Sequence, residues 1–392
     1  MTDVFILSGQ RTAIGDYGKS LKDVPPTKLG EIVIRAALGK SGVTAADVQH
    51  VMMGNVIHTE PRDAYLSRVA AVGAGIPVET PALTLNRLCG SGMQAVVSAA
   101  QSIMLGDADI AVAGGAESMS RGGYLLPNER WGARLGDSQV VDMVVGALHD
   151  PFGHGHMGVT AENVAAQYGL SRGDQDKFAA ESHRRAAAAI AAGYFKEQIA
   201  PVELPSRKGT VIFDTDEHPR SDTSAESLAG LKPAFKKDGT VTAGNASSLN
   251  DGAAALVLAS GAEVKRRALK PLARIVAYGH AGVAPEVMGL GPVPASRHAL
   301  RRAGLSVTDM DVIESNEAFA AQACAVAKDL EFDPAKVNPN GGAVALGHPV
   351  GASGAIITVK AIYELHRVGG RYALVTMCIG GGQGIAMVLE RV

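Results

Sequence analysis

Hydrophobic positions along the chain follow two alternating patterns. The segment PALTLN (81–86) is typical of an extended chain, and MQAVVSAAQSIMLG (93–106) places its apolar residues at helical spacing. Between them, LCGSG (88–92) is typical of a turn. Near the end of the chain, RYALVTMC (371–378) is an apolar run of strand type, and the glycine-rich turn IGGGQG (379–384) follows it. Strands that alternate with helices predict an α/β fold, with mixed or parallel sheets covered by helices.

Part of this pattern occurs twice. Gly92 begins an alanine-rich helical segment and precedes Ala111 of the next strand at the same separation as Gly354 precedes Ala373. Two upstream segments, each a short strand that ends in a turn, also match: DVQHVMMGN (47–55) and DMDVIESNE (309–317). The repeat predicts two similar βαβ halves.

The segment between the halves, from about Arg121 to Thr242, has a different composition. It is irregular and rich in glycine, proline, histidine and charge, and one helical stretch (171–195) interrupts it. We predict an inserted loop domain at 121–242, an N-terminal half at 1–120 plus 243–270, and a C-terminal half at 271–392. The basic residues of the insertion could meet phosphates or form a solvated charged surface: Arg207, Lys208, Arg220, Lys232, Lys236 and Lys237.

Composition and charge narrow the possible classes of protein. The 392 residues are 46% hydrophobic, and we expect no apolar run long enough to cross a bilayer, no secretory segment and no C-terminal targeting tripeptide. These features predict a globular cytoplasmic protein without a membrane partner. Three cysteines without a C-x-x-C pair argue against a disulfide framework and against a thiolate zinc site. A net charge of -2 argues against nucleic acid as a partner.

Cys89 is a candidate nucleophile because its turn directly precedes a predicted helix. Unpaired N–H groups and the positive end of the helix dipole favour a thiolate there, so we expect a pKa below the free value of about 8.5. Gly90 and Gly92 leave room for a substrate carbonyl to approach backbone N–H groups.

Cys378 is predicted at the carboxyl end of a strand, where open α/β sheets place their ligand crevice. A cysteine in an apolar run is more often a small buried hydrophobe, and Cys324 in the helical AAQACAVAK receives that interpretation. The glycines around Cys89 and Cys378 favour a functional role for these two. His348 in LGHPVG is a further candidate, although a histidine beside proline can also be a structural hydrogen-bonding group.

The sequence predicts neither a metal site nor a phosphate loop. His154 and His156 lie near Asp150, but their separation by one residue and the adjoining glycines do not suit a metal site, so no metal is predicted. A phosphate loop of the G-x-x-x-x-G-K-S/T type is also absent from the sequence.

Eight motifs together resemble the thiolase family, in the same order and over essentially the whole length. They are RTAIG, NRLCGSG, GGAESMS, HMGVTAENVA, GNASSLNDGAAA, NEAF, NGGAVALGHPVGASG and CIGGGQG. The likeness is greatest to bacterial biosynthetic acetyl-CoA acetyltransferases and broad-range β-ketothiolases. It implies a five-layered α-β-α-β-α fold of two duplicated βαβαβαββ halves, with an inserted loop domain that binds coenzyme A.

The resemblance also implies the activity and assembly. The expected reaction is a reversible, ping-pong Claisen condensation of two acyl-CoA molecules to a 3-ketoacyl-CoA, with acyl groups somewhat longer than acetyl accepted. Coenzyme A is then a substrate and product, no cofactor is tightly bound, and the expected assembly is a homotetramer built as a dimer of dimers.

The matched motifs imply a role for each catalytic residue. Cys89 attacks the thioester, His348 takes its proton, and Cys378 removes the α-proton of the second acyl-CoA. Asn316 holds a water that, with His348, donates to the enolate oxygen. From the residues alone, Asn316 could instead cap the helix that begins at EAFAAQA. The N–H groups of Cys89 and Gly380 form a second oxyanion hole.

The resemblance assigns coenzyme A and acyl contacts to a further set of residues: Leu148, His156, Met157, Arg220, Ser227, Ala234, Phe235, Ser247, Leu249, Met288, Ala318 and Phe319. The chain departs from the family pattern at Ser221, Lys232 and Ser248, where histidine, arginine and glycine are common, which puts nucleotide contacts in doubt.

Two alternatives remain. One is a non-catalytic acyl-CoA-binding protein on the same fold, which the intact set of Cys89, Asn316, His348 and Cys378 argues against. The other is a decarboxylating ketoacyl synthase, which shares the fold but has one active cysteine. Cys378 distinguishes the chain from that class.

Overall fold

A mixed sheet of ten strands forms the framework of the protein, whose computed structural model describes residues 2–392. Along the sheet the strands run in the order β12 (Val312–Ser315), β13 (Tyr372–Ile379), β14 (Gln383–Arg391), β11 (Ala273–Gly282), β1 (Val4–Arg11), β10 (Asn250–Ser260), β5 (Ile110–Ser118), β3 (His50–Gly54) and β4 (Ala82–Leu85). The short strand β2 (Gly15–Asp16) pairs with β10. β1 and β11 pair only through Phe5 with Arg274 and Ile6 with Ala273. The sheet therefore consists of two half-sheets that are joined by this short contact.

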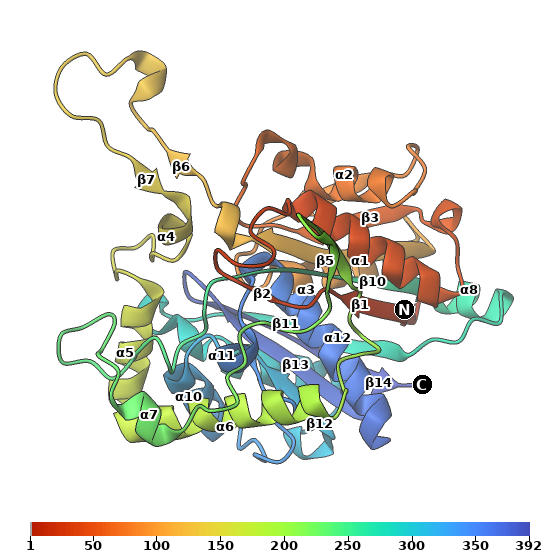
Figure 1. The fold of residues 1–392 in the computed structure, drawn as a ribbon. Helices are drawn as coiled ribbons and strands as arrows, with labels where there is room; N and C mark the ends of the chain where they lie inside the picture. Colours follow the sequence, from red (N-terminus) through yellow and green to blue (C-terminus); the bar gives the residue numbers. More distant parts are fainter. Residues whose placement is uncertain (1) are drawn as a thin grey trace.

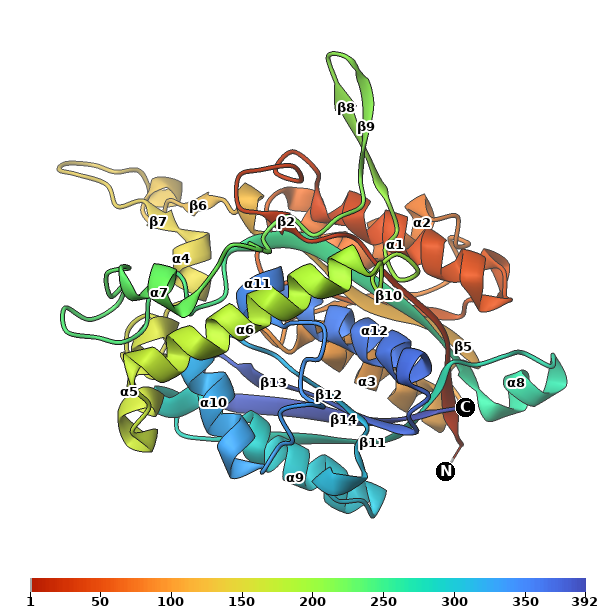
Figure 2. The same cartoon turned by 60° about the horizontal axis from the view of Figure 1, so that its bottom comes forward.

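Helices form three layers around the two half-sheets. α3 (Ser91–Leu105) and α12 (Val350–Val368) pack against each other and against both half-sheets, so they form the central layer (Figure 2). α1 (Pro26–Ser41) and α2 (Leu66–Gly73) cover the outer face of the N-terminal half-sheet. α9 (Pro292–Ala303) covers the outer face of the C-terminal half-sheet, with α10 (Ala320–Asp329) beside it. The predicted five-layered α-β-α-β-α fold is confirmed.

The predicted duplication is visible where the two central helices meet. A Cβ atom added to Gly92 of α3 would lie 2.7 Å from the backbone nitrogen of Ala355, and one added to Gly354 of α12 would collide with Met93. The two glycines that marked the sequence repeat are therefore the points where the helix backbones touch, and any larger side chain would separate them. The halves differ at the outer edge of each half-sheet. In the N-terminal half β4 pairs with β3, whereas in the C-terminal half a single parallel bridge between Ile313 and Val337 takes the place of that strand.

The chain between β5 and β10 leaves the layered body. It contains β6 (Tyr124–Leu125), β7 (Val141–Asp142), α4 (Met143–Ala147), α5 (Met157–Tyr168), α6 (Arg172–Ala191), β8 (Val202–Ser206), β9 (Gly209–Phe213) and α7 (Ala225–Ala229). The predicted helix at 171–195 is confirmed by α6, whose N-cap Ser171 accepts from the backbone nitrogen of Asp174. The β6–β7 and β8–β9 hairpins both project from the body (Figures 1 and 2).

The remaining elements are short. They are α8 (Gly261–Arg266), α11 (Ala343–Leu346) and the 3₁₀ turns Ala45–Asp47, Pro61–Tyr65, Met119–Arg121, Glu129–Trp131, Pro285–Leu290 and Val307–Asp309.

Within residues 2–392, one segment has the length and composition of a membrane-spanning helix, Leu88–Leu105, with a mean hydropathy of 1.2. The expectation that no apolar run reaches that length is wrong for this segment. It is apolar because α3 lies between the half-sheets, where Met93, Val96 and Val97 are fully buried.

Candidate active site

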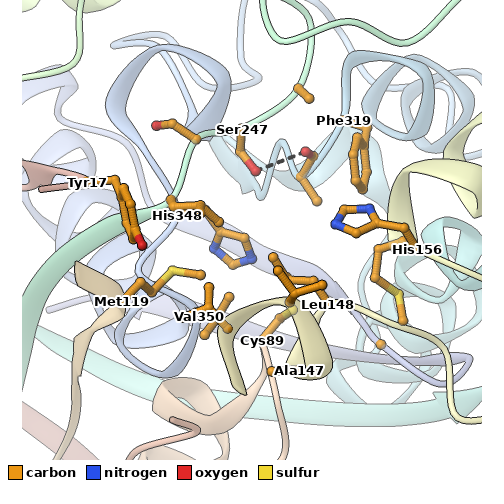
Figure 3. A pocket seen from close by; sticks show the side chains of 18 of the residues that line it. Tyr17, Cys89, Met119, Ala147, Leu148, His156, Ser247, Phe319, His348 and Val350 are labelled. Carbon is orange, nitrogen blue, oxygen red and sulfur yellow. Dashed lines mark hydrogen bonds between the residues drawn. The ribbon is translucent and has the colours of Figure 1, made fainter. Parts of the chain in front are cut away.

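A cavity of about 530 Å³ opens where the inserted segment meets both halves of the fold. Cys89, His348, Cys378 and Gly380 all line it, although they come from three separate places in the chain: two turns and the end of β13. Figure 3 shows the ring of His348 and the side chain of Cys89 pointing into this space. The structure therefore brings together the residues that the sequence motifs singled out.

Cys89 lies in the predicted turn, one residue before the N-cap Gly90 of α3. The turn is strained, because Leu88 has a φ of 45°, in the left-handed region that bulky side chains avoid. A Cβ atom on Gly90 would lie 2.5 Å from Cδ1 of Ile379. Glycine at position 90 thus allows the end of β13 to approach the thiol closely.

The expected low pKa of Cys89 is wrong for this structure. Burial raises the pKa of the thiol above its ordinary value, although the nearby backbone N–H groups of Gly380 and Cys89 act in the opposite direction. The free-energy cost of desolvating a thiolate is larger than the stabilisation that the helix N-terminus gives it. Cys89 is therefore a neutral thiol that needs a base.

His348 has the arrangement of such a base. Its backbone N–H donates to Oδ1 of Asn250 over 2.8 Å, which fixes the turn, and its Nδ1 lies 2.6 Å from Oγ of Ser353. The other ring nitrogen, Nε2, is buried and has no hydrogen-bond partner in the described part of the chain. Burial lowers the pKa of His348 to about 4, so the ring is neutral at physiological pH.

Cys378 is at the carboxyl end of β13, as predicted, and is fully buried. It packs in an apolar cluster with Met157, Met288, Ala318 and Phe319. Burial raises the pKa of this thiol strongly, and the nearby Cys89 raises it further. Once deprotonated, Cys378 would therefore be a strong base.

Asn316 does not cap a helix. α10 begins at Ala320 with Phe319 as its N-cap, and neither side-chain atom of Asn316 has a hydrogen-bond partner among residues 2–392. A buried amide without partners is costly, so this side chain is available to bind a polar group. Asn316 is not itself part of the cavity lining.

The structure brings nearly all the predicted substrate contacts to the cavity. Eleven of them line it: Leu148, His156, Met157, Arg220, Ala234, Phe235, Ser247, Leu249, Met288, Ala318 and Phe319. Ser227 does not, because it is exposed on α7, where its Oγ donates to the carbonyl of Ser224 over 2.8 Å. Among the departures from the family pattern, Ser248 lines the cavity and donates to Oδ1 of Asn250.

Aromatic rings form one wall of the cavity. His156 stacks on Phe235 with ring centroids 4.7 Å apart and an interplanar angle of 16°, and Phe319 meets Phe235 edge-on. Nδ1 of His156 accepts from the backbone N–H of Gly158, and burial lowers the pKa of the ring. A neutral, stacked His156 therefore serves as part of an apolar channel. The neighbouring Asp150 accepts backbone N–H groups of its own turn, from Phe152 and His154.

Sequence reasoning missed a second apolar cluster that packs around Cys89. Ile57, Met119, Val144 and Val350 form its buried part, and all four line the cavity. The two thiols therefore belong to different apolar clusters of one cavity. Met119 and Val350 lie in the motifs GGAESMS and NGGAVALGHPVGASG, but no spacing or composition signal placed Ile57 and Val144 at the site, because each is an ordinary apolar residue.

The duplicated fold and the paired thiols define an α/β protein of the class that transfers acyl groups through cysteine. The family of thiolase N-terminal domains matches residues 4–262, and that of thiolase C-terminal domains matches residues 269–391. The chain belongs to the thiolase family, and it is an acyltransferase that acts on coenzyme A thioesters.

Similar proteins match over nearly their whole length. "Beta-ketothiolase BktB" of Cupriavidus necator is 66% identical over 100% of this chain and 99% of its own. The crystal structure of the Bacillus anthracis acetyl-CoA acetyltransferase has a TM-score of 0.98 and 48% identity, and covers 100% of this chain and 99% of that one. Human mitochondrial 3-ketoacyl-CoA thiolase in complex with CoA has a TM-score of 0.96 and 47% identity, over 100% and 98% of the two chains.

Proposed function

We propose that the chain is a β-ketothiolase in which Cys89 carries the acyl group and Cys378 moves the proton. In the first half-reaction, Nε2 of His348 takes the proton of Cys89, and the sulfur attacks the thioester carbonyl of an acyl-CoA. The bond from the carbonyl carbon to the coenzyme A sulfur breaks. Cys378 gives its proton to the departing coenzyme A thiolate, so the imidazolium and a Cys378 thiolate remain.

The second half-reaction uses these two ions. The Cys378 thiolate removes the α-proton of acetyl-CoA, and His348 and a water on Asn316 donate to the enolate oxygen. The enolate carbon attacks the acyl carbonyl, the bond to the Cys89 sulfur breaks, and His348 returns the proton to Cys89. Two acyl-CoA molecules thus give one 3-ketoacyl-CoA and one coenzyme A, with every proton accounted for.

One observation carries this proposal: two thiols from different halves line a single apolar cavity, beside a buried imidazole whose Nε2 has no partner among the described residues. The backbone N–H groups of Cys89 and Gly380 lower the pKa of the Cys89 thiol, against the effect of burial. The same two donors are suitably placed for an oxyanion that forms next to that sulfur. A ketoacyl synthase has no use for the second thiol.

Labelling separates the two thiols. With radiolabelled acetyl-CoA, the wild-type protein and Cys378→Ala should both become acetylated at Cys89, whereas Cys89→Ala should not. Only the wild-type protein should condense acetyl-CoA or cleave acetoacetyl-CoA with coenzyme A. Loss of acetylation in Cys378→Ala would contradict the assigned roles.

Coenzyme A is the expected substrate and product, held by the inserted segment at 121–242 between the halves at 1–120 plus 243–270 and at 271–392. Arg220 and Ala234 of this segment line the cavity, Leu148 packs in the cluster around Cys89, and Met157 and Phe235 pack in the cluster around Cys378, which supports contact with a coenzyme A thioester. Ser227, exposed on α7, is assigned to the adenosine end.

We also propose a homotetramer in the cytoplasm. The projecting β6–β7 hairpin exposes apolar side chains, with Leu125, Trp131 and Leu135 exposed to 51%, 85% and 101% (Figure 1). An isolated hairpin with such a surface is unfavourable in water, so contact with other copies explains it. The cysteines within residues 2–392 are all free thiols, as a reducing compartment favours.

A further inference from the structure

Glu117 is a buried carboxylate behind the cavity wall, and the catalytic scheme does not use it. It lies in β5 and has no solvent-exposed surface. Oε1 accepts from Nδ2 of Asn55 over 2.9 Å and from the backbone nitrogen of Ile57 over 3.1 Å. Oε2 accepts from the backbone nitrogens of Val56 over 3.1 Å and Gly351 over 2.8 Å. Burial raises the pKa of Glu117 to about 8, but all four partners are N–H donors, and they favour the ionised carboxylate in this arrangement.

These donors come from different halves of the fold. Val56 and Ile57 follow β3 in the N-terminal half and line the cavity. Gly351 is in the first turn of α12 in the C-terminal half, three residues after His348. The intervening Val350 also lines the cavity. Glu117 therefore ties the turn that carries His348 to the wall that faces Cys89.

Gly351, which donates to Glu117, lies at the position that matches Cys89 in the duplicated fold. Cys89 precedes Ser91 of α3 as Gly351 precedes Ser353 of α12, so Gly351 occupies the position of the nucleophile in the other half. The N–H of Cys89 lowers the pKa of the reactive thiol, whereas the N–H of Gly351 donates to Glu117. The carboxylate satisfies the start of α12 from inside the protein, where α3 offers the same kind of donor to the substrate.

We propose that Glu117 is a positioning residue that holds the His348 turn and the Val56–Ile57 wall in register with Cys89. The inference rests on the proposed roles of Cys89 and His348. Gly351 fits the contact closely, because a Cβ atom there would lie 2.5 Å from Oε2 of Glu117. A glutamine at position 117 has the same shape but brings an NH2 group to face two N–H donors, so one pair of donors must move away.

Three variants test the proposal. Glu117→Gln should lower kcat for thiolysis of acetoacetyl-CoA by about 10- to 100-fold, with KM for coenzyme A nearly unchanged, because misplacement of reacting groups by about 1 Å costs that much. Glu117→Asp retains the carboxylate and should recover part of the loss. Gly351→Ala approaches the same contact from the other side and should also lower kcat. If the variants at position 117 fail to fold, Gly351→Ala still tests the proposal.

Glu364→Gln is the matched control. Glu364 is a buried carboxylate on α12, the helix that also carries Gly351, and it is paired with Asn340 and Arg367 near the far end of that helix. It should lower the melting temperature without this loss of kcat. Wild-type kcat in Glu117→Gln, or equal losses of kcat in Glu117→Gln and Glu364→Gln, would overturn the positioning role. Cys89→Ala tests the proposed function separately. If this variant is still acetylated, the role of Cys89 is wrong, whatever the Glu117 variants show.

Discussion

Nδ1 of His348 lies 2.6 Å from Oγ of Ser353, one turn along α12, and that Oγ also lies 3.0 Å from the carbonyl oxygen of Pro349. We assign the serine hydrogen to the carbonyl, so Nδ1 of His348 donates to the serine and Nε2 carries no proton. A neutral imidazole with a free Nε2 is the form that can take a proton from Cys89. The serine at the matching position of α3, Ser91, likewise bonds to the turn before its helix.

Replacing Ser353 by alanine should remove the acceptor that fixes this tautomer. We expect kcat/KM for acetylation of Cys89 to fall by about 10-fold, the equivalent of one buried hydrogen bond of about 1.4 kcal/mol. The measurement is the single-turnover rate of acetylation. Thr358→Val is the control, because Thr358 also donates to a carbonyl within α12, that of Gly354, and is away from His348. Equal effects in both variants would contradict the assignment.

The pH dependence of acetylation follows from two shifted groups. Burial lowers the pKa of His348 to about 4 and raises that of Cys89, so the neutral pair that the mechanism needs persists between these values. We expect kcat/KM for acetylation to be level from about pH 5.5 to 8. A fall with a midpoint near the ordinary histidine value of about 6.5 would show that His348 is not shifted. Stopped-flow rates across this range decide the point.

Val144 of α4 should limit the length of the acyl group. It is buried with Ile57, Met119 and Val350 in the cluster around Cys89. Val144→Ala should raise the ratio of kcat/KM for 3-ketohexanoyl-CoA to that for acetoacetyl-CoA by about 10-fold or less, as expected for room for one or two carbons. Met143→Ala, on the same helix but outside the cavity lining, should leave the ratio unchanged.

The β6–β7 hairpin should control assembly. Replacing Leu125, Trp131 and Leu135 by serine removes exposed apolar side chains that make no contribution to the core. Sedimentation equilibrium should then show a species smaller than the tetramer proposed for the wild-type protein, with an unchanged circular dichroism spectrum. A wild-type protein that sediments as a stable monomer would contradict the tetramer itself.

The sequence predicted the layered fold because the signals were local. The helical spacing after Gly92 and Gly354 and the glycine turns around Cys89 and Cys378 depend on residues close together in the chain. Two expectations were wrong. Leu88–Leu105 has the composition of a membrane span, and the pKa of Cys89 is raised. The pKa of Cys89 was wrongly expected to be low because the helix N-terminus can be recognised from nearby residues. The burial that raises the pKa depends on residues distant in the chain.

The sequence by itself determined the elements, their duplication and the identity of the reactive groups, because periodicity, turn residues and motifs are properties of short segments. Only the tertiary structure decided their chemistry. Burial by distant segments left His348 neutral with a free Nε2 and made both thiols weak acids. It also placed Glu117 of one half against Gly351 of the other. Protonation and positioning depend on the atoms that surround a group in space, and those atoms come from every part of the chain.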